Sequence, residues 1–157
     1  MAELYWVSSP TAGKLAVAAR PRAGDWLQDE ISSWKSAGVE VVVSLLEDDE
    51  IQELDLSLEE VFCSSAGIQY IRFPIKDRGL PTEIRALIRD LADRLSAGNN
   101  ILVHCRAGIG RTGLLASAVL IQIGEQPDEA LRAVGQARGV SVPDTEAQRD
   151  WVLGYRA

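Results

Sequence analysis

Apolar residues along the chain follow two patterns that alternate. Short apolar runs, several of them rich in valine and isoleucine, predict strands that are buried on both faces. Between these runs, apolar residues spaced three and four positions apart predict helices. The predicted strands span residues 4–7, 14–18, 39–46, 68–73 and 101–104. This alternation predicts an α/β fold with a central, mostly parallel sheet of roughly four to five strands flanked by helices.

Residues that commonly cap helices precede three of the apolar stripes. Asp25, Ser57 and Thr82 each carry a side-chain oxygen that can accept a hydrogen bond from the first helical turn. The stripes expected to face the core are Trp26, Leu27, Ile31 and Trp34; Leu58, Val61 and Phe62; and Ile84, Leu87, Ile88, Leu91 and Leu95. From residue 112 onward the pattern is helical over 112–123, 127–137 and 144–155, so the C-terminal third is expected to be helical. Residues 1–157 are expected to form a single domain.

Composition restricts the classes of function. The 157 residues are 46% apolar and 25% charged, which is normal for a globular domain that can bury a core. The net charge of −7 leaves no basic surface for nucleic acid or for an anionic membrane. The longest apolar stretch, residues 114–123, is about half as long as a membrane-spanning helix, so no membrane span is expected. The N-terminus lacks the basic and apolar regions of a signal peptide, and a cytoplasmic location is expected.

Cysteine and histidine are scarce. Cys63 and Cys105 are the two cysteines, and His104 is the single histidine. This inventory is too small for a zinc site of cysteines and histidines or for a disulfide framework. Neither a metal nor another cofactor is therefore expected. Cys63 lies in a predicted helix and is expected to belong to the core.

The segment 104–113, His-Cys-Arg-Ala-Gly-Ile-Gly-Arg-Thr-Gly, lies between a predicted buried strand and a predicted helix. Glycine permits backbone angles that other residues avoid, so such a loop can turn successive N–H groups inward around an anion. The N-terminus of the following helix adds its dipole to the same site. The loop is therefore a candidate phosphate site, made by Arg106, Ala107, Gly108, Ile109, Gly110 and Arg111.

The side chains of this loop indicate chemistry on the bound anion. Arg111 lies six residues after Cys105 and can grip two phosphate oxygens with its guanidinium. The positive field of the loop favours the thiolate form of Cys105, which is a nucleophile for in-line attack on phosphorus. The Thr112 hydroxyl can stabilise the sulfur when it leaves the phosphoenzyme. The ring of His104 is expected to turn away from the anion and to hydrogen-bond nearby backbone.

The pattern His-Cys-x-x-Gly-x-x-Arg-Thr-Gly resembles the signature of the cysteine-dependent protein tyrosine and dual-specificity phosphatases, in particular their small atypical or bacterial-type members. The resemblance extends from about residue 39 to residue 148. It implies a phosphatase that hydrolyses phosphate monoesters through a cysteinyl-phosphate intermediate. It also implies phosphorylated proteins as partners, with phosphotyrosine and also phosphoserine or phosphothreonine as substrates, or another phosphomonoester.

Two further residues are candidates for this reaction. Departure of the substrate oxygen requires a proton donor, and Asp77 on the loop after strand 68–73 is the candidate acid. Its surroundings, Phe-Pro-Ile-Lys-Asp-Arg-Gly-Leu-Pro over residues 73–81, are similar to the general-acid loop of small phosphatases in this family. Thr-Glu-Ala-Gln over residues 145–148 resembles a Thr-x-x-Gln stretch of the family, in which the glutamine positions the hydrolytic water. Gln148 is the matching candidate.

Other interpretations are weaker. Residues 108–113 also match the Gly-x-Gly-x-x-Gly fingerprint of dinucleotide sites, but a Rossmann unit needs a strand where a helix is predicted from residue 127. Sulfurtransferase loops of the rhodanese type are one residue shorter before the arginine. A phosphoinositide phosphatase stays open, because Arg106 fits it, although Ile109 stands where a second basic residue is expected. An inactive phosphate-dependent binding module also stays open as an alternative.

Overall fold

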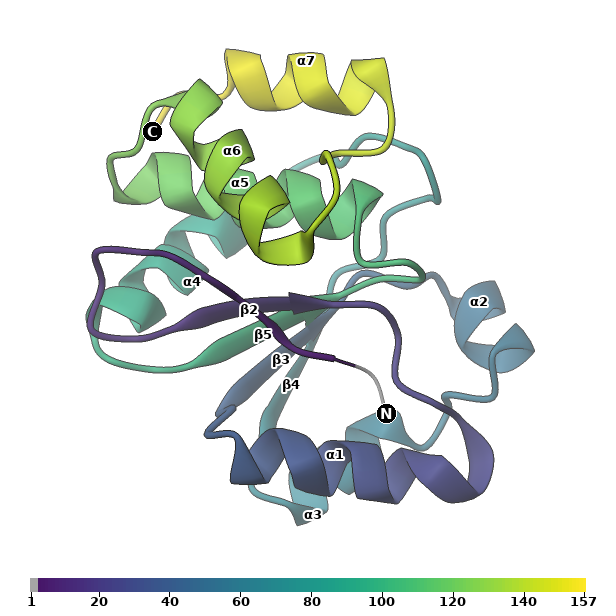
Figure 1. Cartoon of the computed structure of the whole chain (residues 1–157). Helices are drawn as coiled ribbons and strands as arrows, with labels where there is room; N and C mark the ends of the chain where they lie inside the picture. The colour runs from purple at the N-terminus through teal and green to yellow at the C-terminus, as the bar shows by residue number, and fades with distance from the viewer. Residues whose placement is uncertain (1–2) are drawn as a thin grey trace.

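The computed structural model describes residues 3–157, and these contain a five-stranded sheet (Figure 1). The strands are β1 (Tyr5–Val7), β2 (Leu15–Ala18), β3 (Val41–Ser44), β4 (Gln69–Arg72) and β5 (Ile101–His104). Their order across the sheet is β1-β2-β5-β3-β4. β1 pairs with β2 in antiparallel fashion, and the remaining pairs are parallel. The prediction of a mostly parallel sheet is confirmed.

Helices cover both faces of this sheet. They are α1 (Leu27–Ser36), α2 (Asp48–Glu53), α3 (Glu59–Ser65), α4 (Arg85–Ser96), α5 (Gly110–Ile123), α6 (Pro127–Arg138) and α7 (Glu146–Gly154). α1 and α3 lie on one face, at the bottom of Figure 1, and α4 to α7 lie on the other. The helical C-terminal third is confirmed. None of the helices within residues 3–157 combines the length and the apolar character needed to cross a membrane.

The strand side chains alternate between two cores, one on each face of the sheet. Val41, Val43 and Val103 belong to the core under α4 to α7. Val42 and Leu102 belong to the core that α1 and α3 cover. Each of these side chains is fully or almost fully buried, and burying one stabilises the fold by about 1.5–3 kcal/mol. Because both faces require apolar residues, the central strands β2, β3 and β5 are nearly continuous apolar runs in the sequence, whereas the edge strand β4 is only partly buried.

The predicted cap at Asp25 is wrong. Asp25 lies in a short 3-10 helix, Gly24–Trp26, and α1 begins at Leu27 with no side-chain cap. Trp26 was expected on the buried face, but it is 56% exposed because the tighter turn rotates it out of the α1 stripe. The guanidinium of Arg22 lies 4.6 Å from the centre of its ring. The other three residues of the predicted stripe are buried.

Helix α3 also differs from the prediction. It begins at Glu59, and Ser57 does not cap it. Its buried positions are Glu59 and Cys63, which are four residues apart and therefore share one face. Leu58 and Val61, which were expected to face the core, are more than half exposed. A charged residue occupies the inward position because its carboxylate has a buried partner, described below.

Helix α4 begins at Arg85, later than the start predicted at Thr82. Glu83 has a φ of 54°, which is incompatible with a right-handed helix and separates Thr82 from the helical residues. Of the predicted inward stripe, Ile84, Ile88, Leu91 and Leu95 are buried, and Leu87 is partly buried against the same core. This late start leaves residues 73–84 as a long connection between β4 and α4.

The four parallel strands end at the same edge of the sheet, and the loops that follow them meet there. The loop after β5 lies against the end of β2, where the Arg20 N–H donates to the Arg106 carbonyl at 3.2 Å. Gly108 makes this approach possible. Its φ is 72°, and a Cβ at this position would lie 2.4 Å from the carbonyl carbon of Ala18. The phosphate loop predicted from the sequence is therefore anchored to two neighbouring strands.

Candidate active site

The loop between β5 and α5 forms the wall of a cavity of about 210 Å³ at this edge. The lining residues contributed by the loop are Cys105, Arg106, Ala107, Ile109, Gly110 and Arg111, and other segments contribute Asp77, Arg78 and Asp144. Cys105 is buried at the end of β5, and α5 begins at Gly110. The structure therefore brings together three residues predicted from separate arguments: the cysteine, the arginine six positions later and the loop aspartate.

Arg111 is held in a fixed position by groups from three other segments. Its Nη1 and Nη2 donate to Glu50 Oε1 and Oε2 at 2.6 and 3.0 Å. Nη1 also donates to the carbonyl of Ile75 at 2.9 Å, and Nη2 lies 3.2 Å from Asp77 Oδ1. Burial is the largest effect and disfavours the charged guanidinium, but Glu50, together with Cys105 and Asp77, outweighs it and raises the pKa of Arg111. The guanidinium is thus charged and preorganised at the cavity wall.

Glu50 belongs to α2, which sequence analysis did not predict. Burial favours the neutral form of its carboxyl, yet hydrogen bonds from Arg111 and from the Glu47 N–H lower the pKa of Glu50 to about 2. Glu47 and Glu50 form a reciprocal capping box at the start of α2. The run Glu-Asp-Asp-Glu over residues 47–50 was the available signal, because acids favour the first turn of a helix.

The side chain of Arg106 turns toward α2. Its Nε lies 3.3 Å from Glu50 Oε2, and its Nη2 lies 3.3 Å from Glu53 Oε2. The hydrogen bond from Arg106 to Glu50 outweighs desolvation, and with Glu53 it raises the pKa of Arg106. Because this guanidinium has two carboxylate partners, Arg106 contributes to the cavity as part of the loop, and its positive charge is shared with α2.

Asp77 lies on the connection between β4 and α4, with its side chain 59% exposed. Two contacts tie this connection to the start of α7. The Arg78 guanidinium donates to Asp144 Oδ2 at 2.7 Å. The Gln148 side-chain amide donates to the Gly79 carbonyl at 3.2 Å. The connection is therefore held at Arg78 and Gly79, the two residues that directly follow Asp77.

Gln148, the residue expected to position the hydrolytic water, lies beside the phosphate loop, since a Cβ at Gly110 would be 3.1 Å from its Oε1. Gln148 is fully buried and does not line the cavity. Its Oε1 accepts hydrogen bonds from the N–H groups of Asp144 and Thr145, and its Nε2 donates to Gly79. Both ends of the amide are already used, so Gln148 joins the start of α7 to the Asp77 loop. Asp144 provides the polar side chain of this segment at the cavity.

The His104 ring turns away from the cavity, as expected, but its main partner is a carboxylate. His104 Nε2 lies 2.6 Å from Glu59 Oε2, and both side chains are fully buried. His104 Nδ1 lies 3.3 Å from the carbonyl of Cys105. Burial disfavours the imidazolium, but Glu59 outweighs it and raises the pKa of His104. Sequence analysis missed Glu59 because nothing in the sequence around this residue indicates that it faces inward. Its position is explained only by its contact with His104, which is distant in the sequence.

Two other predicted residues lie beneath the loop. Thr112 is buried, and its Oγ1 has no hydrogen-bond partner among residues 3–157, so its predicted interaction with the sulfur stays a prediction. Cys63 is buried in the core on the α1 and α3 side. Burial, with the nearby charge of Glu59, raises the pKa of Cys63 to about 12. Cys63 is therefore a neutral core thiol.

Comparison with known proteins identifies the family to which the chain belongs. A family model described as "Tc-R-P: Polymorphic toxin system, DSP-PTPase phosphatase" matches residues 16–125, which include the β5–α5 loop and Asp77. The chain belongs to this phosphatase family. The predicted resemblance is thereby confirmed, and the dinucleotide interpretation is excluded because α6 follows α5 where a Rossmann unit has a strand.

Relatives among characterised proteins are longer than this chain. The chain is 38% identical over 90 residues to the phosphatidylinositol 3,4,5-trisphosphate 3-phosphatase and protein-tyrosine-phosphatase PTEN1 of Arabidopsis thaliana, with 52% of this chain and 21% of that protein covered. It is 24% identical over 134 residues to cyclin-dependent kinase inhibitor 3 of Rattus norvegicus, covering 83% of this chain and 63% of that protein. The chain therefore spans less than two thirds of the length of these relatives.

Solved structures of phosphatases share the fold over nearly the whole chain. Kinase associated phosphatase, in a form whose catalytic-site cysteine is replaced by serine, superposes with a TM-score of 0.87 at 20% identity, covering 96% of this chain and 92% of that one. The active form of Tk-PTP gives a TM-score of 0.73 at 26% identity, with the same coverage. PTPMT1 in complex with PI(5)P gives 0.73 at 20% identity, covering 94% and 92%.

Proposed function

We propose that this protein hydrolyses phosphate monoesters, with Cys105 as nucleophile, Arg111 as phosphate ligand and Asp77 as general acid. The observation that carries the proposal is the convergence of these three side chains on one cavity at the N-terminus of α5. Arg111 is already charged and oriented by Glu50. Free N–H groups of the loop and of the first turn of α5 supply further donors for phosphate oxygens.

The first step transfers the phosphoryl group to sulfur. A bond forms between the Cys105 thiolate and phosphorus as the bond from phosphorus to the ester oxygen breaks. Asp77 in its acid form gives its proton to the departing oxygen. Negative charge on the equatorial oxygens is stabilised by Arg111 and the loop N–H groups, which need no reorganisation during the reaction.

The second step releases phosphate. A water oxygen bonds to phosphorus while the bond from sulfur to phosphorus breaks, and the Asp77 carboxylate accepts the proton of the water. The thiolate of Cys105 and the acid form of Asp77 are restored, and inorganic phosphate leaves. The hydroxyl of Thr112, buried without a hydrogen-bond partner in the described chain, is proposed to stabilise the departing sulfur.

Phosphorylated proteins are the proposed substrates, with phosphotyrosine first and phosphoserine or phosphothreonine next. The names of the relatives support this, since PTEN1 is named as a protein-tyrosine phosphatase. The same names support a phosphoinositide as the second candidate, because PTEN1 is also named as a lipid phosphatase and PTPMT1 binds PI(5)P. A cytoplasmic location is part of the proposal, because the reaction requires a reduced Cys105 thiol.

Hydrolysis of an aryl phosphate tests the proposal. The wild type should turn over p-nitrophenyl phosphate, and vanadate should inhibit it. C105S should bind phosphate analogues and lose turnover, whereas C63A, which changes the other thiol, should retain turnover. Turnover by C105S would overturn the nucleophile assignment. Binding of a phosphate analogue by the wild type without any turnover would favour the alternative of an inactive binding module.

A further inference from the structure

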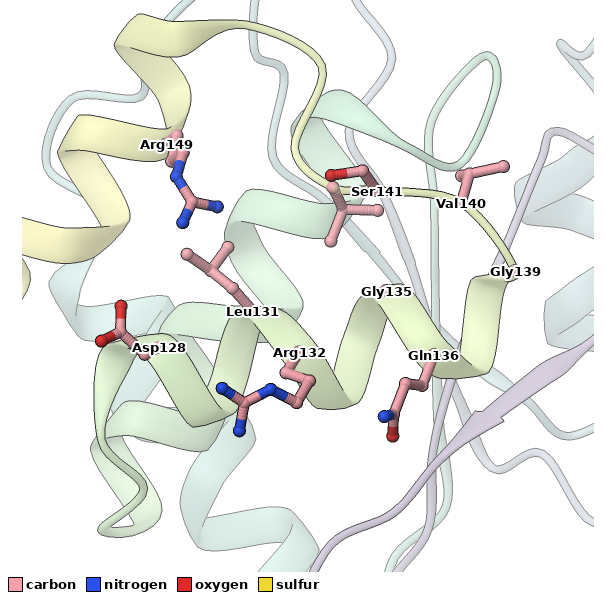
Figure 2. A pocket seen from close by; sticks show the side chains of 10 residues that line it. Asp128, Leu131, Arg132, Gly135, Gln136, Gly139, Val140, Ser141 and Arg149 are labelled. Carbon is pink, nitrogen blue, oxygen red and sulfur yellow. The ribbon is translucent and has the colours of Figure 1, made fainter.

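A larger hollow lies between α6, α7 and the segment that joins them (Figure 2). Its volume is about 740 Å³, compared with about 210 Å³ for the catalytic cavity. The residues that define this α6–α7 groove are Leu131, Arg132, Val140, Ser141, Val142 and Arg149. The groove has no part in the chemistry described above, so its composition calls for a separate explanation.

Two arginines from different helices line the α6–α7 groove. Arg149 of α7 is exposed, and its side chain makes no hydrogen bond or ion pair within residues 3–157. Arg132 of α6 has one contact, to Glu129 at 3.5 Å, and both side chains are about 60% exposed. An exposed ion pair of this kind contributes little. In a chain of net charge −7, the lining of the groove therefore carries two positive charges against one negative charge, that of Asp128.

The groove also has features that suit a peptide. Leu131 and Val142 are buried beneath it, and Val140 at its edge is 43% exposed, so an apolar surface lies beside the two charges. Val140 and Ser141 are exposed and make no backbone–backbone hydrogen bonds in the described chain, which leaves their N–H and C=O groups for an extended segment. A small inorganic anion would not use this surface, whereas an acidic peptide would use all of it.

The groove and the catalytic cavity are lined by neighbouring residues of one segment. Val142 lines the groove and Asp144 lines the cavity, so their Cα atoms are at most about 7 Å apart. Both residues lie close against the start of α5. A Cβ at Gly113 would lie 2.8 Å from Val142 Cβ, and a Cβ at Gly110 would lie 3.0 Å from Asp144 Cβ. A peptide with its phosphate in the cavity needs only a few further residues to reach the groove.

The charged groups around the cavity are distributed differently on its two sides. On the side of α2, Asp48 is paired with Arg72 and Glu53 with Arg106 of the phosphate loop, and Asp49 is exposed. On the side of α6 and α7, the groove lining carries Arg132 and Arg149 against one acid, Asp128, while the exposed acids Glu146 and Asp150 of α7 do not line it. Figure 1 shows α2 well separated from α6 and α7. An acidic segment next to the phosphorylated residue is therefore attracted by the groove and not by α2.

From these observations we infer that the α6–α7 groove binds an acidic segment of the phosphoprotein whose phosphate occupies the catalytic cavity. The inference rests on the proposed function and specifies its substrate class. Arg132 and Arg149 hold carboxylates of the segment, and the apolar surface formed with Val140 packs against its side chains. Asp128, at the end of the groove where α6 begins, opposes this binding (Figure 2).

The test uses C105S as a binding form and three phosphotyrosine peptides: one with an acidic tract before the phosphotyrosine, one with the tract after it, and one neutral. We expect one acidic peptide to bind about tenfold more tightly than the neutral peptide, since two exposed charge pairs each contribute up to about fivefold.

Variants of the groove test which residues cause this preference for the acidic peptide. R132E/R149E should abolish the preference, R132Q/R149Q should reduce it, and D128N should increase it. High salt should weaken it. R89E, which reverses an exposed arginine on α4, is the control and should retain it.

Turnover of p-nitrophenyl phosphate by the wild-type chain and by R132E/R149E separates the two proposals. This small substrate does not reach the groove, so both proteins should turn it over equally. If turnover is normal but neither acidic peptide is preferred, or the preference survives R132E/R149E, the groove inference is wrong while the proposed function holds. If C105S shows the charge-dependent preference but the wild type has no turnover, the groove inference holds and the proposed function is wrong.

Discussion

Arg111 of the phosphate loop and Glu50 of α2 are joined by two parallel hydrogen bonds of 2.6 and 3.0 Å, although the two residues are 61 positions apart in the sequence. The pair fixes the plane of the guanidinium before any phosphate binds. A free arginine side chain would lose rotamer freedom on gripping the phosphate, and this pair removes most of that cost. Glu50 is therefore expected to support the reaction without touching the substrate.

Replacing Glu50 by Gln should lower kcat/KM for p-nitrophenyl phosphate by about tenfold, because the neutral amide holds the guanidinium less firmly and leaves the two bonds weaker. E50A should be worse, since buried Arg111 would keep only the largely exposed Asp77 as a counter-charge, and loss of one partner of a buried pair typically destabilises a fold by about 3–5 kcal/mol. E53Q is the matched control, because Glu53 contacts Arg106 and not Arg111. Equal kinetics for E50Q and the wild type would contradict a positioning role.

The same carboxylate gives a prediction for acid stability. The pKa of Glu50 falls from an ordinary 4.5 to about 2 in the fold. A lowered folded-state pKa contributes stability that is present above about pH 4.5 and is lost as the pH falls toward 2. Denaturant unfolding of the wild type and E50Q should therefore converge as the pH is lowered through this range. A difference in unfolding free energy that stays constant down to pH 2 would contradict the pKa of Glu50.

The ion pair of Arg78 with Asp144 should position Asp77. R78A and D144N are each expected to lower kcat/KM by about three- to fivefold for alkyl phosphates, which depend on a proton donor, because an exposed pair contributes up to about 1 kcal/mol. Aryl phosphates with good leaving groups should be affected less. The charge-swapped variant R78D/D144R should recover part of the loss, and R89A is the control. In the D77N background, R78A should cause no further loss of kcat/KM that depends on the leaving group. An additive loss in that background would contradict a role of Arg78 in positioning Asp77.

The buried pair of His104 with Glu59 should make stability depend on pH in the opposite sense to Glu50. Because Glu59 raises the pKa of His104, its contribution is complete below the ordinary histidine value of 6.5 and is lost as the pH rises through the raised value. The stability advantage of the wild type over E59Q, measured by urea unfolding, should therefore shrink as the pH rises above 6.5. An advantage that grows with pH would show that the imidazole is neutral in the fold.

Two glycines with positive φ provide a matched test of the phosphate loop. A Cβ at Gly98 would meet nothing within 4 Å, whereas a Cβ at Gly108 would lie 2.4 Å from backbone atoms of Ala18. G98A should cost about 1 kcal/mol from the strained φ alone. G108A should cost more, because the loop must move away from β2, and it should also lower turnover. Similar stability and turnover for the two variants would mean that the loop is not anchored at Ala18.

The phosphate loop could be predicted because its chemistry is contiguous. Cysteine, glycines and arginine lie within ten residues, between an apolar run and a helical stripe, so local sequence defines both the backbone and the side chains. The central strands β2, β3 and β5 were equally accessible, because burial on both faces makes each a nearly continuous apolar run. Asp77 was accessible only through the resemblance of its loop to that of a family.

Residues that support this loop from a distance could not be predicted. Glu50, Glu59 and Asp144 contact Arg111, His104 and Arg78 across 61, 45 and 66 positions. An acid in an exposed helix and an acid buried opposite a histidine look the same in a sequence. For Gln148 the motif gave the residue but not its hydrogen-bond partners, and its role toward a water stays a prediction. The late start of α4 follows from the positive φ of Glu83.

The central claim is that the phosphoryl group passes through the sulfur of Cys105. Rapid acid quenching of the enzyme during turnover of p-nitrophenyl phosphate, followed by peptide mass spectrometry, tests it most directly. One phosphoryl group should be found on the peptide that contains Cys105, and it should accumulate in D77N, where the second step lacks its base. Turnover without any phosphorylated Cys105, or phosphoryl transfer to another residue in C105S, would contradict the claim.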